Sequence, residues 1–170
     1  MEKSGQEHVE KERTILWEVS KSLSLQKPHP LDDIFHPKSV AVAGASASEQ
    51  ATGWTARLLN FGYTGRLYPI NPRATEISGL KAYPTVRDIP GPVDYVIVST
   101  PVRLVPQILE DCVAKRVKVV HVYAAGFSEI GKEEGKKLEK QITAIARNGG
   151  IRVIGPNCMG IHCPKSGLAF

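Results

Sequence analysis

Five short runs of apolar, mostly β-branched residues limit the folds that this chain can adopt. They occupy residues 39–44, 66–71, 93–99, 117–123 and 151–155. Because the apolar residues are consecutive, both faces of each predicted strand would be buried, which is typical of strands in a parallel sheet. The runs therefore predict parallel strands at the centre of a domain.

Segments with helical periodicity separate most of these runs, at residues 54–61, 105–113 and 132–147. In the second segment the apolar side chains follow the i, i+3, i+4, i+7 and i+8 spacing of an amphipathic helix. The segment 73–92 is rich in glycine and proline and leaves room for only short elements. The alternation predicts right-handed crossovers and an α/β fold, a Rossmann-like, doubly wound, mainly parallel sheet of about five strands with helices on both faces.

The first 30 residues form a separate region, which we call the leader. It contains five basic and five acidic side chains, and residues 1–13 are almost devoid of apolar ones. We predict a flexible polar leader, with a short helix over residues 14–25 as the alternative. The two prolines at positions 28 and 30 would break any helix, so we place the start of the main domain, 31–170, after them.

The positive charge of the chain lies in the predicted domain. Subtracting the five basic and five acidic leader residues from the 22 and 17 of the whole chain leaves 17 and 12, a net charge of +5. This bias favours an anionic partner, which could be a phosphorylated small molecule, a nucleic acid or a protein. No apolar run reaches the ~18 residues of a membrane span, and three cysteines form no disulfide framework. We expect a cytoplasmic protein with no membrane partner.

Ligands of doubly wound sheets bind outside the carboxyl ends of the strands, so the residues after each run are the candidates. Gly44-Ala45-Ser46-Ala47-Ser48 follows the first run, and such small residues let backbone N–H groups approach a phosphate. The glycines expected next in a dinucleotide-binding fingerprint are replaced by Ser46 and Glu49, and no phosphate-binding P-loop pattern follows. A turn without a ligand is the alternative.

The turns after the second and third runs carry different chemistry. Asn71-Pro72-Arg73 stands where a dinucleotide domain would place an acidic residue for the ribose, and its cation suits a phosphate better. An ordinary solvated arginine is the alternative. Ser99-Thr100-Pro101 precedes a helix, and capping alone could explain these residues.

Seven segments between residue 31 and about residue 163 then combine into a resemblance, at 31–40, 42–46, 68–72, 79–84, 93–96, 125–127 and 155–158. Together they resemble the CoA-binding domain of the nucleoside-diphosphate-forming acyl-CoA synthetases. This group includes the α subunits of ADP-forming acetyl-CoA synthetase and of succinyl-CoA synthetase. The resemblance implies CoA or acyl-CoA as the ligand.

The resemblance also implies roles for the turns. The turn after the first run would hold CoA phosphate, Arg73 would contact the nucleotide end, and the third turn would pass the adenine and pantetheine. The fourth turn would border the pantetheine, and the Gly-Pro-Asn-Cys turn would lie near the thiol. The implied CoA-binding residues are Gly44, Ala45, Ser46, Ser48, Asn71, Arg73, Ser99, Thr100, Pro101, Ala124, Ala125, Gly126, Asn157 and Cys158.

The fourth turn also indicates a branch of the family. Succinyl-CoA synthetases usually have Thr-Glu-Gly there, whereas Ala124-Ala125-Gly126 resembles the ADP-forming acetyl- and acyl-CoA branch. The family's phosphohistidine and its nucleotide-grasp domain have no counterpart in these residues. We therefore expect no catalytic residue here and expect further ligase domains or a β subunit as partners. The alternatives are a stand-alone CoA carrier or sensor and, less favoured, an NAD(P)-binding dehydrogenase domain.

Several other residues invite a functional interpretation that the pattern does not favour. Cys158, His162 and Cys163 cluster, but no second Cys/His pair completes a zinc site, so we expect no metal. His121 lies within an apolar run and is predicted to be a hydrogen-bonded core residue. The mixed charges of residues 132–140 indicate an exposed helix face, and no aromatic–basic pattern predicts a nucleic-acid partner.

Overall fold

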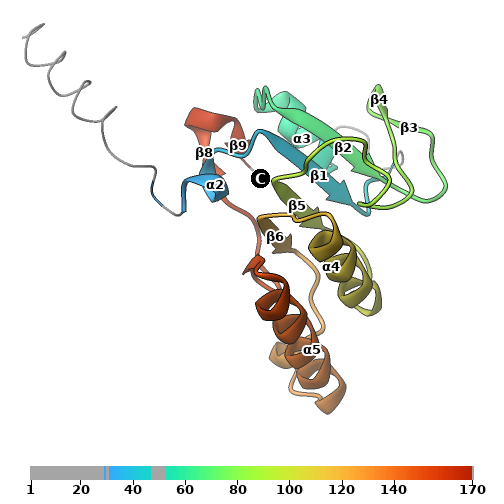
Figure 1. Ribbon diagram of the computed structural model, residues 1–170, viewed down its shortest axis with the longest axis vertical. Coiled ribbons are helices and arrows are strands. Elements are labelled where there is room, and N and C mark those ends of the chain that lie inside the picture. The colour runs from blue at the N-terminus through green and yellow to red at the C-terminus, as the bar shows by residue number, and fades with distance from the viewer. Residues whose placement is uncertain (1–28, 30, 47–52, 170) are drawn as a thin grey trace, which may run out of the picture. The chain divides into compact units, whose positions relative to one another are not determined.

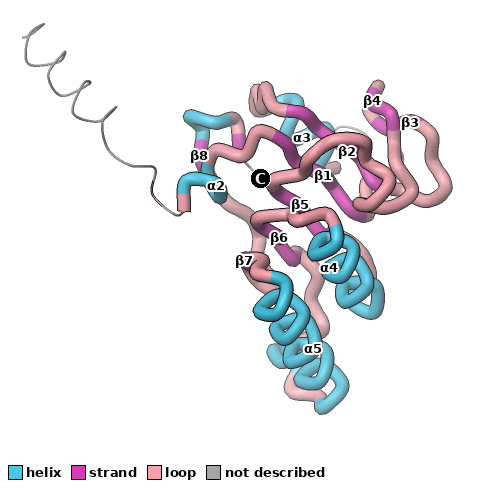
Figure 2. The backbone as a smooth tube through the Cα atoms, in the orientation of Figure 1, coloured by secondary structure: helices cyan, strands magenta, loops and turns pink. Residues whose placement is uncertain are grey.

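A five-stranded parallel sheet forms the centre of the computed structural model, which describes residues 29, 31–46 and 53–169 (Figures 1 and 2). Its strands lie in the order β2-β1-β5-β6-β7. They are β1 (Ser39–Ala43), β2 (Arg66–Ile70), β5 (Tyr95–Val98), β6 (Val119–Val122) and β7 (Arg152–Ile154). Each lies within one of the five predicted runs, and all four pairings are parallel. The predicted parallel sheet is confirmed.

Burial along the strands explains why these sequences occupy these positions. All residues of β1, β5 and β6 are buried, which matches their continuous apolar runs at the centre of the sheet. The edge strands β2 and β7 are only partly buried and begin with the exposed residues Arg66 and Arg152. In the register of the sheet, Ala43 at the end of β1 lies opposite Ile70 of β2 and Val98 of β5. The turns that follow these three strands therefore lie side by side at the carboxyl ends of the strands.

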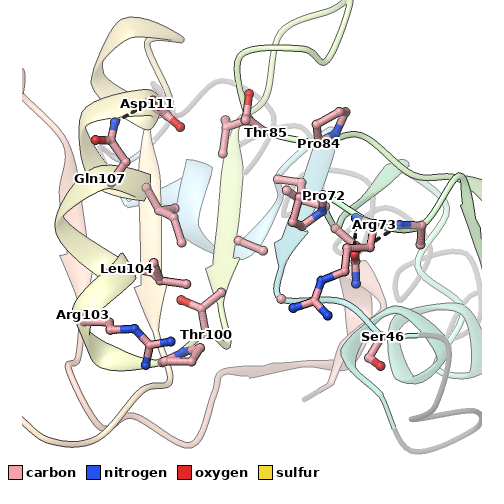
Figure 3. A pocket seen from close by; sticks show the side chains of 18 residues that line it. Ser46, Pro72, Arg73, Pro84, Thr85, Thr100, Arg103, Leu104, Gln107 and Asp111 are labelled. Carbon is pink, nitrogen blue, oxygen red and sulfur yellow. Dashed lines mark hydrogen bonds between the residues drawn. The ribbon is translucent and has the colours of Figure 1, made fainter.

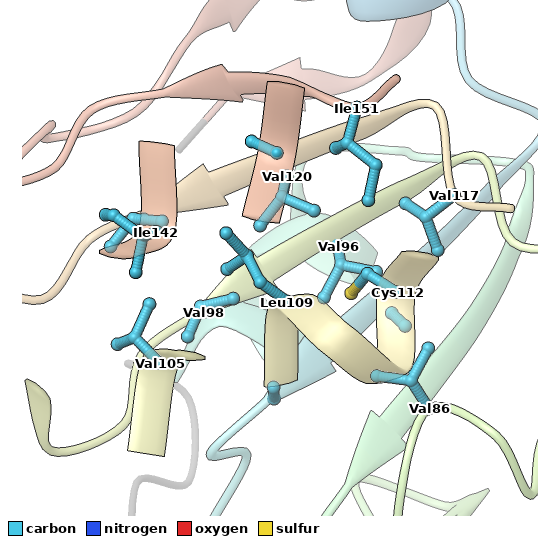
Figure 4. Packing of buried hydrophobic residues seen from close by; sticks show 14 of the residues in the cluster. Val86, Val96, Val98, Val105, Leu109, Cys112, Val117, Val120, Ile142 and Ile151 are labelled. Atoms are coloured by element: carbon cyan, nitrogen blue, oxygen red, sulfur yellow. The ribbon is translucent and has the colours of Figure 1, made fainter. Parts of the chain in front are cut away.

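Helices cover both faces of the sheet, as predicted. On one face, α4 (Val105–Ala114) and α5 (Glu133–Gly149) pack beside each other and cover β5, β6 and β7. Leu109 of α4 and Ile142 of α5 belong to the same buried cluster as Val96, Val98 and Val120 of the sheet (Figure 4).

The other face is covered by α3 (Trp54–Asn60) together with a small C-terminal hairpin. The hairpin consists of β8 (His162–Cys163) and β9 (Leu168–Ala169), joined by a 3-10 turn at Pro164–Ser166. Leu58 of α3 and Leu168 of β9 are fully buried with the strand residues of this face. The core is therefore divided into two apolar layers, one on each side of the sheet.

The remaining elements are short. β3 (Glu76–Ile77) and β4 (Leu80–Lys81) form an antiparallel hairpin between β2 and β5, as expected for the segment 73–92. The helix α2 (Asp32–Phe35) precedes β1, and 3-10 turns lie at Val102–Leu104 and Ser128–Ile130. No helix within residues 31–46 and 53–169 is long and apolar enough to cross a membrane. Almost the whole leader lies outside the described residues, so its flexibility, its helix and the boundary at residue 30 stay predictions.

Candidate ligand-binding site

The turns after β1, β2 and β5 are joined by hydrogen bonds that continue the sheet. The backbone N–H of Gly44 donates to the carbonyl of Ile70 over 3.2 Å, and that of Ser99 donates to the carbonyl of Ala43 over 2.9 Å. Gly44 has a φ of +91°, and a Cβ at this position would lie 2.3 Å from the carbonyl oxygen of Ser99. Only glycine fits there, because the backbones of the first and third turns are in direct contact.

Asn71 holds the second turn against the first. Its side-chain Nδ2 donates to the carbonyl of Ala45 over 2.8 Å, and its Oδ1 accepts from the N–H groups of Arg73 at 2.8 Å and Ala74 at 3.2 Å. The amide of Asn71 is thus engaged with the main chain at both ends. The turn that it forms places the exposed Arg73 beyond the carboxyl end of β2.

A cavity of about 780 Å³, which we call the first cavity, lies between these turns and α4 (Figure 3). In Figure 3 the side chain of Arg73 reaches into this space from one side, and α4 forms the opposite side. The first cavity is lined by Ala43, Gly44, Ser46, Ile70, Asn71, Pro72, Arg73, Ala74, Pro84, Thr85, Val86, Thr100, Pro101, Arg103, Leu104, Gln107, Ile108 and Asp111.

One face of α4 provides the wall opposite Arg73. Gln107, Ile108 and Asp111 of α4, with Leu104 at its N-cap, follow the i, i+3, i+4, i+7 spacing that brings side chains to one side of a helix. The preceding residue, Arg103, is exposed and adds a second guanidinium to the lining. The first cavity therefore combines apolar walls with two cations, which suits a ligand with a planar apolar group and phosphates.

A second cavity of about 310 Å³ lies along the ends of β5 and β6. It is lined by Ser99, Thr100, Pro101, Val102, Tyr123, Ala124, Ala125, Asn157 and Met159. Thr100 and Pro101 line both cavities, so the two cavities lie on either side of the turn after β5. Among the residues that the structure describes, no cation lines the second cavity, which suits an uncharged part of a ligand.

The turn after β7 is fixed to the end of β6. The N–H groups of Asn157 and Cys158 donate to the carbonyls of Ala124 at 3.1 Å and Val122 at 3.4 Å. Nε2 of His121 donates to the carbonyl of Cys158 over 2.8 Å, since a carbonyl can only accept. His121 is fully buried, and burial lowers its pKa, so the imidazole stays neutral near pH 7. The predicted hydrogen-bonded core histidine is confirmed.

The two cavities collect most of the residues predicted from the sequence. The first cavity is lined by Gly44, Ser46, Asn71, Arg73, Thr100 and Pro101, and the second adds Ser99, Ala124, Ala125 and Asn157. Ala45, Gly126 and Cys158 line neither cavity. The N–H of Gly126 donates to Oε1 of Glu129 over 2.6 Å, and Sγ of Cys158 lies 3.7 Å from the carbonyl oxygen of Gly160. Ser48 lies outside the described residues.

Sequence reasoning missed two groups of lining residues. Residues 84–86 line the first cavity but belong to a segment without a recognisable binding motif. On α4 the apolar spacing predicts only the side that faces the core, not the neighbouring polar side chains. The spacing of Gln107 and Asp111 beside that stripe was the available signal. Within residues 31–46 and 53–169, no three His, Cys, Asp or Glu side chains gather to hold a metal ion.

Fold and cavities together define a Rossmann-like domain with its cleft at the carboxyl ends of parallel strands. Residues 38–164 match the family described as CoA binding domain. The chain belongs to this family, and CoA is its ligand.

Proteins similar to the chain include ADP-forming acid–CoA ligases. The α subunit of acetate–CoA ligase (ADP-forming) I of Pyrococcus furiosus is 44% identical over 137 residues, 77% of this chain and 29% of the relative. The 4-hydroxybutyrate–CoA ligase (ADP-forming) of Nitrosopumilus maritimus is 39% identical over 130 residues, 75% of this chain and 18% of the relative. The chain thus spans less than a third of these relatives.

A solved structure gives the same result. The dinucleotide forming acetyl-coenzyme A synthetase 1 of Ca. Korarchaeum cryptofilum, in complex with phosphate and ADP, aligns with a TM-score of 0.75 and 38% sequence identity. The alignment covers 81% of this chain and 30% of that chain. The resemblance drawn from the sequence is confirmed.

Proposed function

We propose that this chain is the CoA-binding part of an ADP-forming acyl-CoA ligase, and that CoA lies across both cavities. The nucleotide half would occupy the first cavity and the pantetheine the second. The observation that carries this proposal is that Thr100 and Pro101 line both cavities, which offers a continuous path past the turn after β5.

The charges of the first cavity support this orientation. CoA carries a 3′-phosphate and a pyrophosphate on its nucleotide half, and guanidinium groups bind phosphate through paired hydrogen bonds. Arg73 and Arg103 line the first cavity, and both are exposed. The small residues Gly44 and Ser46 allow the backbone to approach a phosphate closely.

The second cavity has the properties expected for the pantetheine. Ala124 and Ala125 contribute only methyl groups, and no charged side chain of the described part of the chain lines this cavity. Met159 lies at its mouth with 74% of its surface exposed, and its flexible thioether can adapt to a slender chain. The thiol would then end near Asn157.

The complete ligase would form acyl-CoA from a free acid, CoA and nucleoside triphosphate, with the reverse reaction also open. The names of the relatives include acetate and 4-hydroxybutyrate, so the family uses more than one acid. We propose further ligase domains or a β subunit as partners, because one relative is an α subunit and each relative extends far beyond the matched region.

We also propose a cytoplasmic location, which agrees with the three free cysteines.

Filling the second cavity tests the proposed orientation. Ala125 is exposed, so Ala125→Leu can be made without disturbing the core. We expect it to weaken CoA binding by about tenfold, because the larger side chain would overlap the pantetheine. Binding of adenosine 3′,5′-bisphosphate, the nucleotide half alone, should change less than about twofold. Both affinities can be measured by calorimetric titration.

Ala144→Leu provides the matched control, because Ala144 is exposed on α5 and lines neither cavity. It should leave both affinities unchanged. Equal losses of CoA and of adenosine 3′,5′-bisphosphate in Ala125→Leu would contradict the proposal, since the nucleotide half would then lie in the second cavity.

A further inference from the structure

We infer that Asp111 selects the base of the ligand, by accepting a hydrogen bond from the exocyclic amine of adenine at the far end of the first cavity. This inference rests on the proposed function, because it assumes that the nucleotide half of CoA occupies the first cavity. It assigns base specificity to an acidic side chain in a site that otherwise favours anions.

The position of Asp111 separates it from the cationic part of the first cavity. Leu104, the N-cap of α4, and Asp111 lie seven residues apart on one side of the helix, a distance of about 10 Å along its axis. Arg103 precedes Leu104, so the guanidinium and the carboxylate stand at opposite ends of this wall. Figure 3 shows the same order along the helix, from Arg103 through Leu104 and Gln107 to Asp111.

Asp111 is held by two neighbouring side chains. Nε of Arg87 donates to its Oδ1 over 2.7 Å, and Nε2 of Gln107 donates to the same oxygen over 3.3 Å. Only 12% of the side chain of Asp111 is exposed, so the ion pair with Arg87 offsets much of the cost of burying the charge. Within the described residues Oδ2 makes no hydrogen bond, and Asp111 belongs to the lining of the first cavity.

Charge decides which part of CoA can lie beside this oxygen. Arg87 pairs with Asp111 but does not line the first cavity, whereas Arg73 and Arg103 do, so the nucleotide phosphates belong at the end with these two cations. The group left for the Asp111 end is the base, which would pack against the apolar side chains of Val86 and Ile108. Adenine presents an amine that donates, whereas a carboxylate only accepts. The two groups are therefore complementary.

A base that carries a keto group in place of the exocyclic amine of adenine would place an acceptor opposite Oδ2 of Asp111, which is also an acceptor. Hypoxanthine differs from adenine in this way and would leave two acceptors facing each other in a largely buried site. Sites built to bond a donor reject analogues that lack it, because their polar group is then left without a partner. Asp111 would thus select adenine over keto bases of the same shape.

The experiment compares CoA with the analogue in which hypoxanthine replaces adenine, by calorimetric titration of the full chain. The unchanged protein should bind CoA about tenfold or more tightly than the analogue, because a hydrogen bond to a charged group is lost. In Asp111→Asn this ratio should fall below about threefold, since an amide can donate to a keto group as well as accept from an amine.

Glu110→Gln is the matched control. It removes the same charge from the neighbouring residue of α4, which is exposed and lies outside the cavity lining, and should leave the ratio unchanged. If Asp111 served only to pair with Arg87, Asp111→Asn would lower the Tm without changing the ratio, and the inference would be wrong. Equal binding of both ligands by the unchanged protein would also overturn it. Absence of CoA binding would instead overturn the proposed function as well.

Discussion

Replacing Arg73 by alanine is expected to weaken CoA binding by roughly ten- to a hundredfold, because a charge-assisted hydrogen bond to phosphate contributes on the order of 1.5–3 kcal/mol. Arg73 is exposed and follows a turn that the amide of Asn71 orients, so its guanidinium is available to a ligand. The Tm should change little, because the side chain is exposed. Calorimetric titration with CoA measures the loss.

Dephospho-CoA identifies the phosphate that Arg73 contacts. If Arg73 binds the 3′-phosphate, its substitution should weaken dephospho-CoA much less than CoA. Equal losses for both ligands would assign Arg73 to the pyrophosphate. Arg147→Ala removes an exposed arginine from α5, away from both cavities, and should leave CoA binding unchanged. No loss in Arg73→Ala would mean that Arg73 is an ordinary surface residue and that the site has been assigned wrongly.

The second large effect is expected from Gly135→Ala, which should lower the free energy of unfolding by about 3 kcal/mol. Alanine normally stabilises a helix interior relative to glycine, by about 1 kcal/mol. At Gly135, however, a Cβ would lie 2.0 Å from the carbonyl oxygen of Phe127. Phe127 is fully buried, so its backbone cannot move without disturbing the core. The substitution should therefore also displace the turn after β6 that borders the second cavity.

Thermal unfolding measures this effect. A loss of that size corresponds to a decrease in Tm of roughly 6–12 °C for a chain of this length. Glu134→Ala, at the exposed neighbouring position of α5, should change the free energy of unfolding by less than about 0.5 kcal/mol. A Tm for Gly135→Ala equal to or above that of the unchanged protein would show that α5 does not approach the turn so closely.

The strands could be predicted because their burial is complete. β1, β5 and β6 are buried at every position, so runs of consecutive apolar residues were enough to predict these strands. The turns could be located for the same reason, since each one begins where its run ends. The pattern could not predict that residues 84–86 line the same cavity as α4, so that one side of this helix forms a cavity wall. Gln107 and Asp111 appear solvent-facing in the sequence for that reason.

Individual turn residues were harder to assign than the turns themselves. Asn71 lines the first cavity, yet both ends of its amide bond the main chain, so its role in the site is to orient the turn before Arg73. Ala45 supplies its carbonyl to the same bond, and Gly126 donates its N–H to Glu129. A sequence motif records that a residue type is needed at a position. It cannot distinguish contact with a ligand from support of the backbone that makes the contact.

Calorimetric titration of the chain with CoA and with NAD tests the central claim most directly. CoA should bind with micromolar-scale affinity, about −8 kcal/mol, and NAD far more weakly. The difference is expected because the turn after β2 presents Arg73 where a nicotinamide-dinucleotide domain has an acidic residue for the ribose. Tighter binding of NAD than of CoA would contradict the account.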